Sequence, residues 1–567
     1  MLTFIHTYTN ETFGGLLESG LWHDGDGLKL MHKTYYPSKY TFNEYARIGS
    51  LLNRYLEELK CPFYIDRLLG GNPLPYWYDY DPQLLRHYKN LLADDFWGFQ
   101  MHEWASNYRS ESRRIEAAVA EWVQKNGTDT LDAFWQKNIE IARSGEVPIF
   151  VEALTIEEWS KRTPPKSLTE FLENCKKIWG LRLQQTGGPL FPADSYYMAP
   201  KYEIAGGAKM LLPEVGWQIG ETRFQIAYTR GMAKAAGIPW GIYYECWCAQ
   251  DRQGLTIPFS ADEAMNEWFN ETDLLEQMCR MTGNRPEQGG SSRSLQERAW
   301  LYAWFSGATV MGEEYGICNT FRDYHDFELS EYGLVKKRFL DLTRKYPNIG
   351  KTYTPIAIVL PAELDIYSID EKPDTYLGFS LEGDIDPSLT RKIRRAREVI
   401  GALLHDRHPM QNTKTGSDEH CIQNSPFPDV FDVLHADQEA ALAKYEYMID
   451  LTGDSTFAAK HNNIVTVDEL PSLLERLLPC TVSDDVHYTL NKTENGWLLL
   501  AINNKGVIRN DFTGDRFLPE AAIHARLRLR NDTRGLHVLE GTGALHSENG
   551  QYTLSLGAGQ WLMLALY

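Results

Sequence analysis

The sequence predicts an α/β protein of three parts: a (β/α)8 TIM barrel, a small doubly wound α/β domain and a C-terminal antiparallel β-sandwich. The chain has 567 residues, which is more than one domain usually holds. Up to about residue 350, short apolar segments alternate with long helical patterns, as is typical of a parallel sheet. From about residue 484 onward, short strand patterns follow one another between Gly and Asn turns.

Residues 1–350 contain eight segments that we predict as barrel strands, enough to close a (β/α)8 barrel. They are Thr3–Tyr8, Pro62–Asp66, Trp97–His102, Pro148–Glu152, Asp194–Met198, Met210–Pro213, Trp240–Glu245 and Ala308–Glu313. Helical patterns between them cover Phe42–Leu59, Gln83–Leu92, Glu111–Asn126, Leu131–Arg143, Leu168–Leu183, Thr222–Ala236, Ala261–Arg280 and Leu295–Phe305. Only a short segment separates the fifth strand from the sixth, and if the fifth is not a barrel strand, the numbering shifts.

Residues 351–482 repeat the alternation on a smaller scale, which indicates a flavodoxin-like or amidotransferase-like α/β domain. Its predicted strands are Pro355–Leu360, Asp429–His435, Tyr447–Leu451 and Asn463–Val467, with helices Thr390–Leu404, Asp437–Lys444 and Leu470–Leu478. No G-x-G-x-x-G turn follows a strand, so a dinucleotide cofactor is not predicted. Residues 483–567 would form the β-sandwich from strands such as Trp497–Ile502, Ile523–Leu529 and Gln560–Leu566.

Composition excludes several classes of function. The chain has 77 Asp and Glu against 57 Lys and Arg, and its net charge of −20 argues against nucleic acid or an anionic membrane as partner. No window approaches 18 consecutive apolar residues, so no membrane span is predicted. The eight Cys have neither a disulfide framework nor zinc-like spacing, and no export signal is visible. We therefore expect a cytoplasmic protein without metal or cofactor.

Carboxylates recur where the predicted barrel strands end, and barrel active sites form at that end. Glu152, Glu214, Glu245 and Glu313 each end or directly follow a strand, and Glu103 follows another. Crowded, partly desolvated carboxylates can keep one member protonated near neutral pH. Cleavage of a glycosidic bond needs such a pair, one as acid and one as nucleophile or base. Neighbouring Trp and Tyr rings can stack on sugar rings, although each Glu could instead pair with an Arg or cap a helix.

The catalytic candidates are Glu152, Glu245 and Glu214. Opposed strands four and seven favour Glu152 as acid/base and Glu245 as nucleophile, while the turn around Pro213 makes Glu214 a close competitor. The candidate substrate-binding residues are Asp66, Arg67, His102, Glu103, Trp104, Trp217, Tyr244, Trp247 and Glu313. Glu103 could also act as an acid.

The order of barrel, α/β domain and β-sandwich resembles the layout of the glycoside hydrolase family 42 β-galactosidases. That resemblance implies an acid/base Glu after an Asn on strand four and a nucleophile Glu on strand seven. Glu245 fits the second position; Glu152 follows Val151 instead of Asn, which indicates a divergent relative. The resemblance further implies that the middle domain supports a homo-oligomer, a dimer or trimer.

The predicted function is therefore a metal-independent glycoside hydrolase that acts on a small oligosaccharide or glycoside. Retention is favoured, and inversion stays open because the sequence does not give the separation of the two carboxyl groups. Two alternatives stay open. The barrel could host a lyase or isomerase of an anionic sugar, with His102 or a Tyr as base. It could also be a non-catalytic scaffold that binds carbohydrate or forms oligomers.

Overall fold

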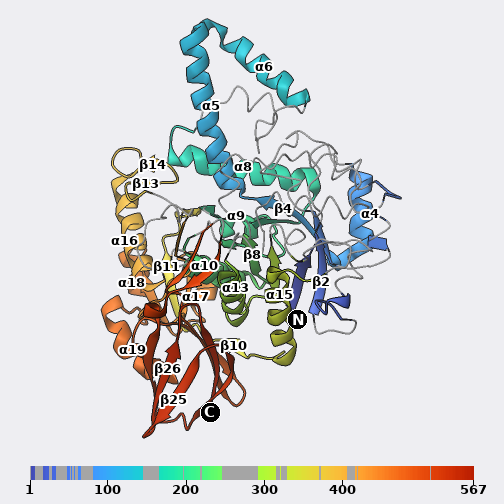
Figure 1. Ribbon diagram of the computed structural model, residues 1–567. Helices are drawn as coiled ribbons and strands as arrows, with labels where there is room; N and C mark the ends of the chain where they lie inside the picture. Colours follow the sequence, from blue (N-terminus) through green and yellow to red (C-terminus); the bar gives the residue numbers. More distant parts are fainter. Residues whose placement is uncertain are drawn as a thin grey trace.

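The computed structural model describes the greater part of the chain (Figure 1). The described residues are 2–6, 17–23, 28–33, 47–50, 53, 56–57, 62–65, 81–144, 165–193, 195, 197–216, 220–245, 292–313, 320, 328–368, 372–404, 415–417, 419, 421–510 and 513–567. None of the helices in these ranges is long and apolar enough to span a membrane.

A parallel sheet of eight strands forms the centre of the N-terminal half. Its strands are β1 (Leu2–His6), β2 (Leu28–Lys33), β3 (Phe63–Ile65), β4 (Phe96–His102), β5 (Leu190–Ala193), β7 (Glu214–Gly216), β8 (Gly241–Glu245) and β9 (Val310–Glu313). The order across the sheet is β5-β4-β3-β2-β1-β9-β8-β7. The first strand, β1, pairs in parallel with both β2 and the last strand, β9. Apart from this pairing, neighbouring strands follow one another in chain order. The two strands at the edges of the sheet, β5 and β7, are also next to each other in the chain order of its strands.

The two faces of this sheet belong to different hydrophobic clusters. One face, which we call the inner face, carries a compact cluster of buried side chains. They are Tyr64, Phe191, Ala193, Met210, Leu212, Tyr243 and Val310. Residues from β5, from the segment before β7 and from β3 meet in this one cluster, so the sheet curls around it. The alternating residues of the same strands, such as Phe99, Ile242, Tyr244 and Met311, join the larger core shared with the helices.

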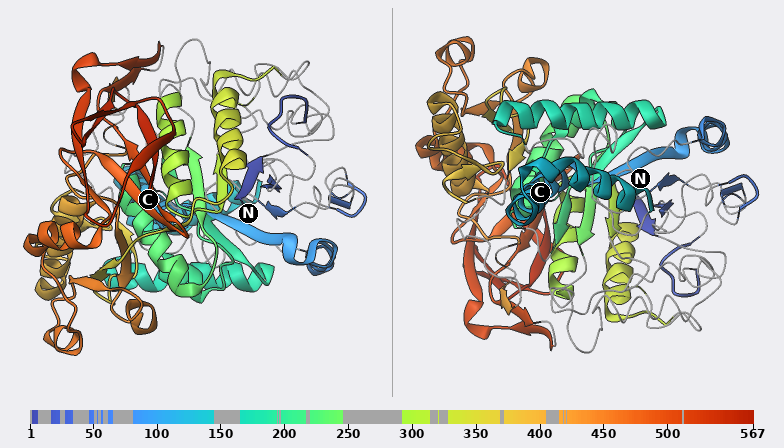
Figure 2. Two further views of the ribbon diagram at one scale, coloured as in Figure 1. Left: turned by 90° about the horizontal axis from the view of Figure 1, so that it is seen from below. Right: turned by 90° about the horizontal axis from the view of Figure 1, so that it is seen from above.

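The helices of this half are α4 (Pro82–Leu92), α5 (Trp104–Asn126), α6 (Leu131–Ser144), α8 (Leu168–Thr186), α9 (Pro200–Ala205), α10 (Thr222–Ala236), α13 (Arg293–Phe305) and α15 (Glu331–Lys345). Local sequence explains where several begin: Ser292 Oγ accepts from Leu295 N (3.0 Å) and Ser330 Oγ from Gly333 N (3.0 Å), which caps α13 and α15. Helices α5 and α6 project together from the body (Figure 1). Figure 2 shows α13 and α15 side by side, with C-terminal strands next to α13.

The predicted strand numbering was wrong, although most of the helices were placed correctly. Leu28–Lys33 and Leu190–Ala193 were missed. Because Leu28–Lys33 precedes it, the predicted third strand, Trp97–His102, is the fourth strand of the sheet. Among the described residues of the predicted fifth strand, Tyr197–Met198 form β6, which pairs antiparallel with β12 (Tyr367–Ser368) outside the parallel sheet. The predicted sixth strand, Met210–Pro213, precedes β7, and its Leu211 forms a single bridge to Trp240. The predicted strand Pro148–Glu152 lies outside the described residues.

A second, three-stranded parallel sheet follows, in the order β16 (Phe431–His435), β11 (Ile356–Leu360), β17 (Tyr447–Asp450). Ala357, Val359 and Leu434 pack on one face with α17 (Glu439–Leu442) and α18 (Ser455–Lys460). The alternating residues belong to the large core, as does α16 (Pro387–Leu403). The predicted strand Asn463–Val467 was wrong: among its residues, only Ile464 forms a bridge, to Met448.

Helix α10 joins the two parallel sheets, which explains why its residues 222–233 are buried on all sides. A Cβ on Gly231 would lie 2.4 Å from Val433 O, so glycine allows α10 to pack directly on β16. The buried Asp432 carboxylate accepts from Arg230 Nε (2.5 Å), Lys234 Nζ (2.7 Å), Thr354 Oγ1 (2.8 Å) and Tyr445 OH (2.8 Å). This network fixes the register between helix and sheet.

The C-terminal part is antiparallel. One sheet has the order β10 (Lys351–Thr352), β19 (His487–Thr493), β20 (Gly496–Ile502), β27 (Trp561–Leu566), β24 (Leu536–Gly541). The second has the order β18 (Cys480–Val482), β23 (Ile523–Leu529), β26 (Gln551–Leu556), β25 (Ala544–Glu548). Both contribute buried residues to one core, and a smaller sheet of β15 (Thr415–Ser417), β21 (Val507–Asn510) and β22 (Thr513–Phe517) lies beside them.

Candidate active site

Glu245 is the last residue of β8, at the carboxyl end of the eight-stranded sheet. It follows Tyr243 by two residues, and Tyr243 belongs to the inner-face cluster, so Glu245 lies on the same face. Only 1% of its surface is exposed. A carboxylate in this position is largely removed from bulk water, which makes its charge state sensitive to neighbouring groups.

Glu214, the first residue of β7, is a second carboxylate on the inner face. It follows the clustered Leu212 by two residues and is the direct cross-strand neighbour of Tyr243. It is 3% exposed. One pleat further along, Gly216 is the cross-strand neighbour of Glu245, and a Cβ on it would lie 2.3 Å from Glu245 O. Glycine at this position therefore allows the strand that carries Glu245 to approach β7 closely.

Glu103, a third carboxylate, directly follows β4 and is half-buried. Its backbone is left-handed (φ 46°, ψ 38°), which turns the chain sharply from the strand into α5. Glu103 N donates to Ala193 O at 2.8 Å, and Ser195 Oγ donates to the Glu103 carboxylate. The two contacts hold Glu103 against the end of the neighbouring strand β5.

The buried amide of Gln225 in α10 connects these groups across the edge of the sheet. Its Nε2 donates to Ser195 O at 2.9 Å and to Glu214 O at 2.7 Å. One nitrogen thus ties the segment that supports Glu103 to the strand that carries Glu214, and Gly216 brings Glu245 next to that strand. These contacts join the backbone segments that carry Glu103, Glu214 and Glu245.

On the inner face below these carboxylates, aromatic side chains are fully buried. Tyr64 meets Phe191 edge to face, with ring centroids 4.9 Å apart, and Tyr243 packs in the same cluster. Gln100 on β4 pairs in register with Phe191 and is fully buried, and neither atom of its amide has a hydrogen-bond partner in the described part of the chain. Such a floor lowers the effective dielectric constant around the carboxylates above it and strengthens their interactions.

Glu313, which the sequence predicts to bind substrate, lies on the outer face of the sheet. It follows Met311, an outer-face residue, by two positions, so it points toward the helices. Its carboxylate lies 2.7 Å from Lys336 Nζ of α15 and accepts from Gln296 Nε2 of α13. The structure uses Glu313 to anchor two helices on β9.

Two predicted sugar-binding rings are also packing residues. Tyr244 is fully buried in the large core, and its hydroxyl donates to Ser292 O at 3.4 Å. Trp104 is fully buried in the helix layer, where its Nε1 donates to Glu203 Oε1 at 3.3 Å and its ring packs on Trp179. Tyr244 is the penultimate residue of β8 and Trp104 comes two residues after β4, and both rings belong to the core shared with the helices.

The remaining predicted site residues are not placed by the structure. Asp66, Arg67, Glu152, Trp217 and Trp247 lie outside the described residues, and for His102 only the backbone, at the end of β4, is described. Conversely, Ser195 and Gln225 belong to the site but were not predicted, because their contacts join segments far apart in the chain. Within the described ranges, no group of three or more His, Cys, Asp or Glu is arranged to hold a metal ion.

No protein-family model matches the chain, and no curated protein matches it in sequence. Among solved structures it is similar to α-L-fucosidase isoenzyme 2 from Paenibacillus thiaminolyticus, with 9% identity over 99% of each chain and a TM-score of 0.39. It is also similar to a polyextremophilic β-galactosidase from the Antarctic haloarchaeon Halorubrum lacusprofundi, with 8% identity over 100% of this chain and 98% of that chain and a TM-score of 0.41. It is similar as well to a rhamnosidase from Novosphingobium sp. PP1Y, with 8% identity over 88% of this chain and 49% of that chain and a TM-score of 0.33.

Proposed function

We propose that the chain is a glycoside hydrolase whose reacting carboxylates are Glu245 and Glu103. The observation that carries this proposal is the position of two buried carboxylates on the inner face of neighbouring strands, Glu214 on β7 and Glu245 on β8, with Glu103 directly after β4. Glu103 is linked to the strand of Glu214 through Ser195 and Gln225. Paired carboxylates in a partly desolvated site are what hydrolysis of a glycosidic bond needs.

The sheet itself supports the proposal when it is taken as the wall of a (β/α)8 barrel. Eight parallel strands in cyclic order, curled around one inner cluster, fit that architecture. In this numbering β4 and β8 are strands four and seven, which lie on opposite sides of a barrel. Glu103 and Glu245 would then face each other across its mouth. The barrel (1–350), the α/β domain (351–482) and the β-sandwich (483–567) would form the three predicted domains.

The surroundings of the two residues suggest their roles. Glu245 is deeply buried on the inner face and would attack the anomeric carbon, while the bond to the leaving oxygen breaks and Glu103 gives that oxygen a proton. Glu103 is half-buried, so it can exchange protons with solvent, and the Ser195 hydroxyl orients it. In the second step Glu103 takes a proton from water, the water attacks the same carbon, and the bond to Glu245 breaks, with net retention.

Glu214 supplies a further negative charge beside Tyr243 on the inner face. Like charges close together disfavour full ionisation, so Glu214 would help to keep the acid protonated and would accept hydrogen bonds from substrate hydroxyls. Glu152 stays a prediction from the sequence. Because the fourth strand of the sheet is β4, Glu103 takes the acid/base position that the sequence assigned to Glu152.

A panel of aryl glycosides tests the proposal with Glu245→Gln, Glu103→Gln and Glu152→Gln variants. We expect Glu245→Gln to lower kcat by roughly four orders of magnitude, about 5.4 kcal/mol of barrier. Glu103→Gln should cost roughly 10²–10⁴-fold with a poor leaving group and far less with dinitrophenolate, which leaves without a proton. Azide should restore turnover in Glu103→Gln, since it needs no general base.

Glu313→Gln is the matched control, because it changes an equally buried strand-end carboxylate that faces the helices. If the wild type hydrolyses none of the glycosides, the proposed function is wrong. If Glu152→Gln shows the leaving-group dependence and azide rescue, and Glu103→Gln does not, the acid/base assignment is wrong.

A further inference from the structure

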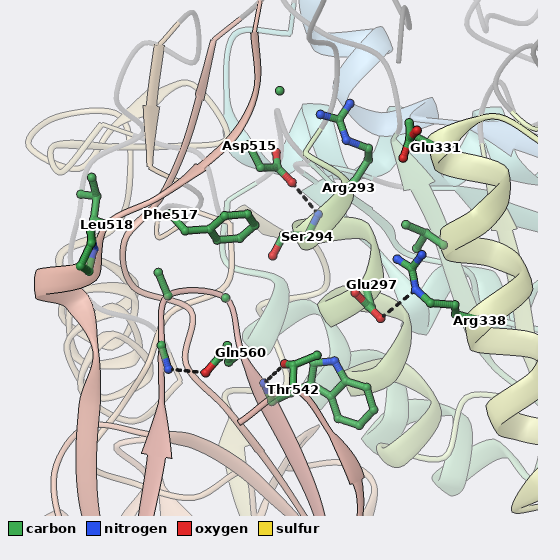
Figure 3. Close-up of a pocket in the computed structure, with 17 residues that line it drawn as sticks. Arg293, Ser294, Glu297, Glu331, Arg338, Asp515, Phe517, Leu518, Thr542 and Gln560 are labelled. Atoms are coloured by element: carbon green, nitrogen blue, oxygen red, sulfur yellow. Dashed lines mark hydrogen bonds and ion pairs between the residues drawn. The ribbon is translucent and has the colours of Figure 1, made fainter. Parts of the chain in front are cut away.

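A cleft of about 720 Å³ lies between α13 and α15 on one side and the C-terminal strands on the other (Figure 3). It belongs to the outside of the helix layer, so the eight-stranded sheet does not line it. One wall consists of Arg293, Ser294, Glu297, Glu331, Val335 and Arg338. The opposite wall includes Gly514, Asp515, Phe517, Leu518, Gln560 and Trp561. Its volume is within the usual range of small-molecule sites.

Specific contacts hold the two walls together at the bottom of the cleft. Asp515 Oδ2 accepts from Ser294 N at 2.9 Å, in the first turn of α13. A Cβ on Gly514 would lie 2.2 Å from Arg293 Nη2, and one on Gly559 would lie 2.6 Å from Ser294 Oγ. Gly559 therefore allows the C-terminal strands to approach the first turn of α13, whereas at Gly514 the flexible Arg293 side chain could move aside.

An aromatic ring reaches into this space from the C-terminal side. Phe517, the last residue of β22, is 51% exposed, and its ring points across the cleft toward Ser294 (Figure 3). Trp561 lines the same wall and is mostly buried. A half-exposed Phe ring is costly in water, and covering it with another flat apolar surface would be favourable.

The charges of the cleft are nearly balanced, which restricts what it can bind. Arg293 and Arg338 face Glu297, Glu331 and Asp515, and Arg338 Nε lies 3.6 Å from Glu297 Oε1. An anion would meet three carboxylates, and a fully apolar ligand would remove five charged groups from water without compensation. A neutral ligand with many hydroxyls can donate to the carboxylates and accept from the guanidinium groups.

We propose that this cleft is a second binding site that takes a neutral oligosaccharide. One apolar face of a sugar ring would stack on Phe517, and its hydroxyls would reach Glu297, Arg338 and Arg293 on the opposite wall. The site is separate from the carboxylates of the inner face and does not depend on hydrolysis. It would hold a saccharide on the outside of the protein, where α13 and α15 meet the C-terminal strands.

Isothermal titration calorimetry tests this site with a panel of cellobiose, lactose, maltotriose, mannotriose and xylotriose, added to the full chain carrying Glu245→Gln. We expect at least one of them to bind with a Kd of roughly millimolar order, as few contacts allow. Adding Phe517→Ala should weaken this binding at least tenfold, and adding Glu297→Gln should weaken it severalfold. Val538→Ala is the control, because Val538 is an exposed apolar residue of the neighbouring sheet outside the cleft.

Thermal unfolding of each variant checks that the fold is intact, which is expected for the half-exposed Phe517. If none of the saccharides binds, or if binding is equal in the Phe517→Ala and Val538→Ala proteins, the inference is wrong. The outcome is distinguishable from a failure of the proposed function: Phe517→Ala in the otherwise unchanged chain should hydrolyse a small aryl glycoside at the wild-type rate. If the wild type hydrolyses no glycoside, the proposed hydrolase function is wrong, but the result on saccharide binding in the cleft stays valid.

Discussion

Glu245 and Glu313 occupy equivalent positions on neighbouring strands but have opposite surroundings. Each ends its strand, each is at most 3% exposed, and Glu313 is the cross-strand neighbour of Tyr244, one residue before Glu245. Glu245 lies on the inner face with Tyr243, whereas Glu313 lies on the outer face and is held by Lys336 and Gln296. A Glu at a strand end can thus lie on either face of the sheet, and the face determines whether it meets the helices or the inner cluster.

This contrast gives a general expectation for the buried polar groups. Those on the outer face and in the helix layer should affect stability, because each compensates a charge or a donor that folding removes from water. Those on the inner face at the carboxyl end should affect turnover. Substitutions on each face can test whether outer-face groups affect stability and inner-face groups affect turnover.

The largest effect on stability is expected at the outer-face ion pair. Glu313→Gln leaves the Lys336 ammonium buried without its counter-charge. Lys336→Met leaves the Glu313 carboxylate buried without its cation. We expect each to lower the free energy of unfolding by about 3–5 kcal/mol. Activity per folded molecule should stay within about threefold, which urea unfolding and active-fraction titration can measure. A loss of turnover without a loss of stability would place Glu313 in the site.

Gly216→Ala should affect turnover instead. The added Cβ would collide with the backbone of Glu245 and move its carboxylate by a fraction of an ångström or more. We expect a loss of kcat of about 100-fold, or about 2.7 kcal/mol of barrier. Gly237→Ala is the control, since Gly237 also has a positive φ but has no atom within 4 Å of the added Cβ. Equal losses in both variants would mean that backbone strain, and not the position of Glu245, is responsible.

The buried His435 should make stability depend on pH without changing the site. Burial, with a smaller contribution from Lys201, lowers its pKa to about 4, and Tyr228 OH lies 2.6 Å from its Nε2. Because the unfolded chain protonates near pH 6.5, stability is complete above that pH and falls progressively between pH 6.5 and 4. We expect a loss of about 2 kcal/mol between pH 7.5 and pH 5 from this group.

His487, whose pKa burial also lowers, should add to the loss in the same direction. Unfolding of His435→Gln at both pH values measures the first contribution, because the variant lacks the titrating ring. If wild type and variant lose equal stability between the two pH values, His435 is not buried in its neutral form.

The smallest effect is expected for Tyr244→Phe. This change removes only the hydroxyl that donates to Ser292 O from the outer face. We expect a loss of about 1 kcal/mol of stability and no more than a twofold change in kcat. A change of KM for an aryl glycoside would show that Tyr244 contacts substrate after all.

Much of this architecture was predictable from local patterns, and the errors have physical causes. Long amphipathic segments with capping residues, such as Leu168–Leu183 after Ser167, gave helices at the expected positions. Leu28–Lys33 was missed because its apolar residues alternate with Lys and His, and Leu190–Ala193 because it is four residues long and contains Pro192. The omission of Leu28–Lys33 moved the predicted fourth strand from Trp97–His102 to Pro148–Glu152, and with it the predicted acid/base candidate to Glu152.

The face of each carboxylate was partly readable as well. The spacing of two between Tyr243 and Glu245 predicts a common face, but only tertiary contacts show that this face is the inner one. The pairing of Glu313 with Lys336, and the bridge from Gln225 to Ser195 and Glu214, join residues that no sequence spacing connects. Local periodicity therefore located the candidate carboxylates, and long-range contacts show which of them lie on the inner face of the sheet.

The central claim, that Glu245 is the nucleophile, is tested most directly by covalent trapping. The wild-type chain is incubated with a 2-deoxy-2-fluoro glycosyl fluoride of the sugar that the aryl-glycoside panel identifies, and the labelled peptide is sequenced by mass spectrometry. We predict one glycosyl group per chain, esterified to Glu245. A label on Glu214, Glu152 or Glu313, or continued turnover with inversion and without any label, would contradict the assignment.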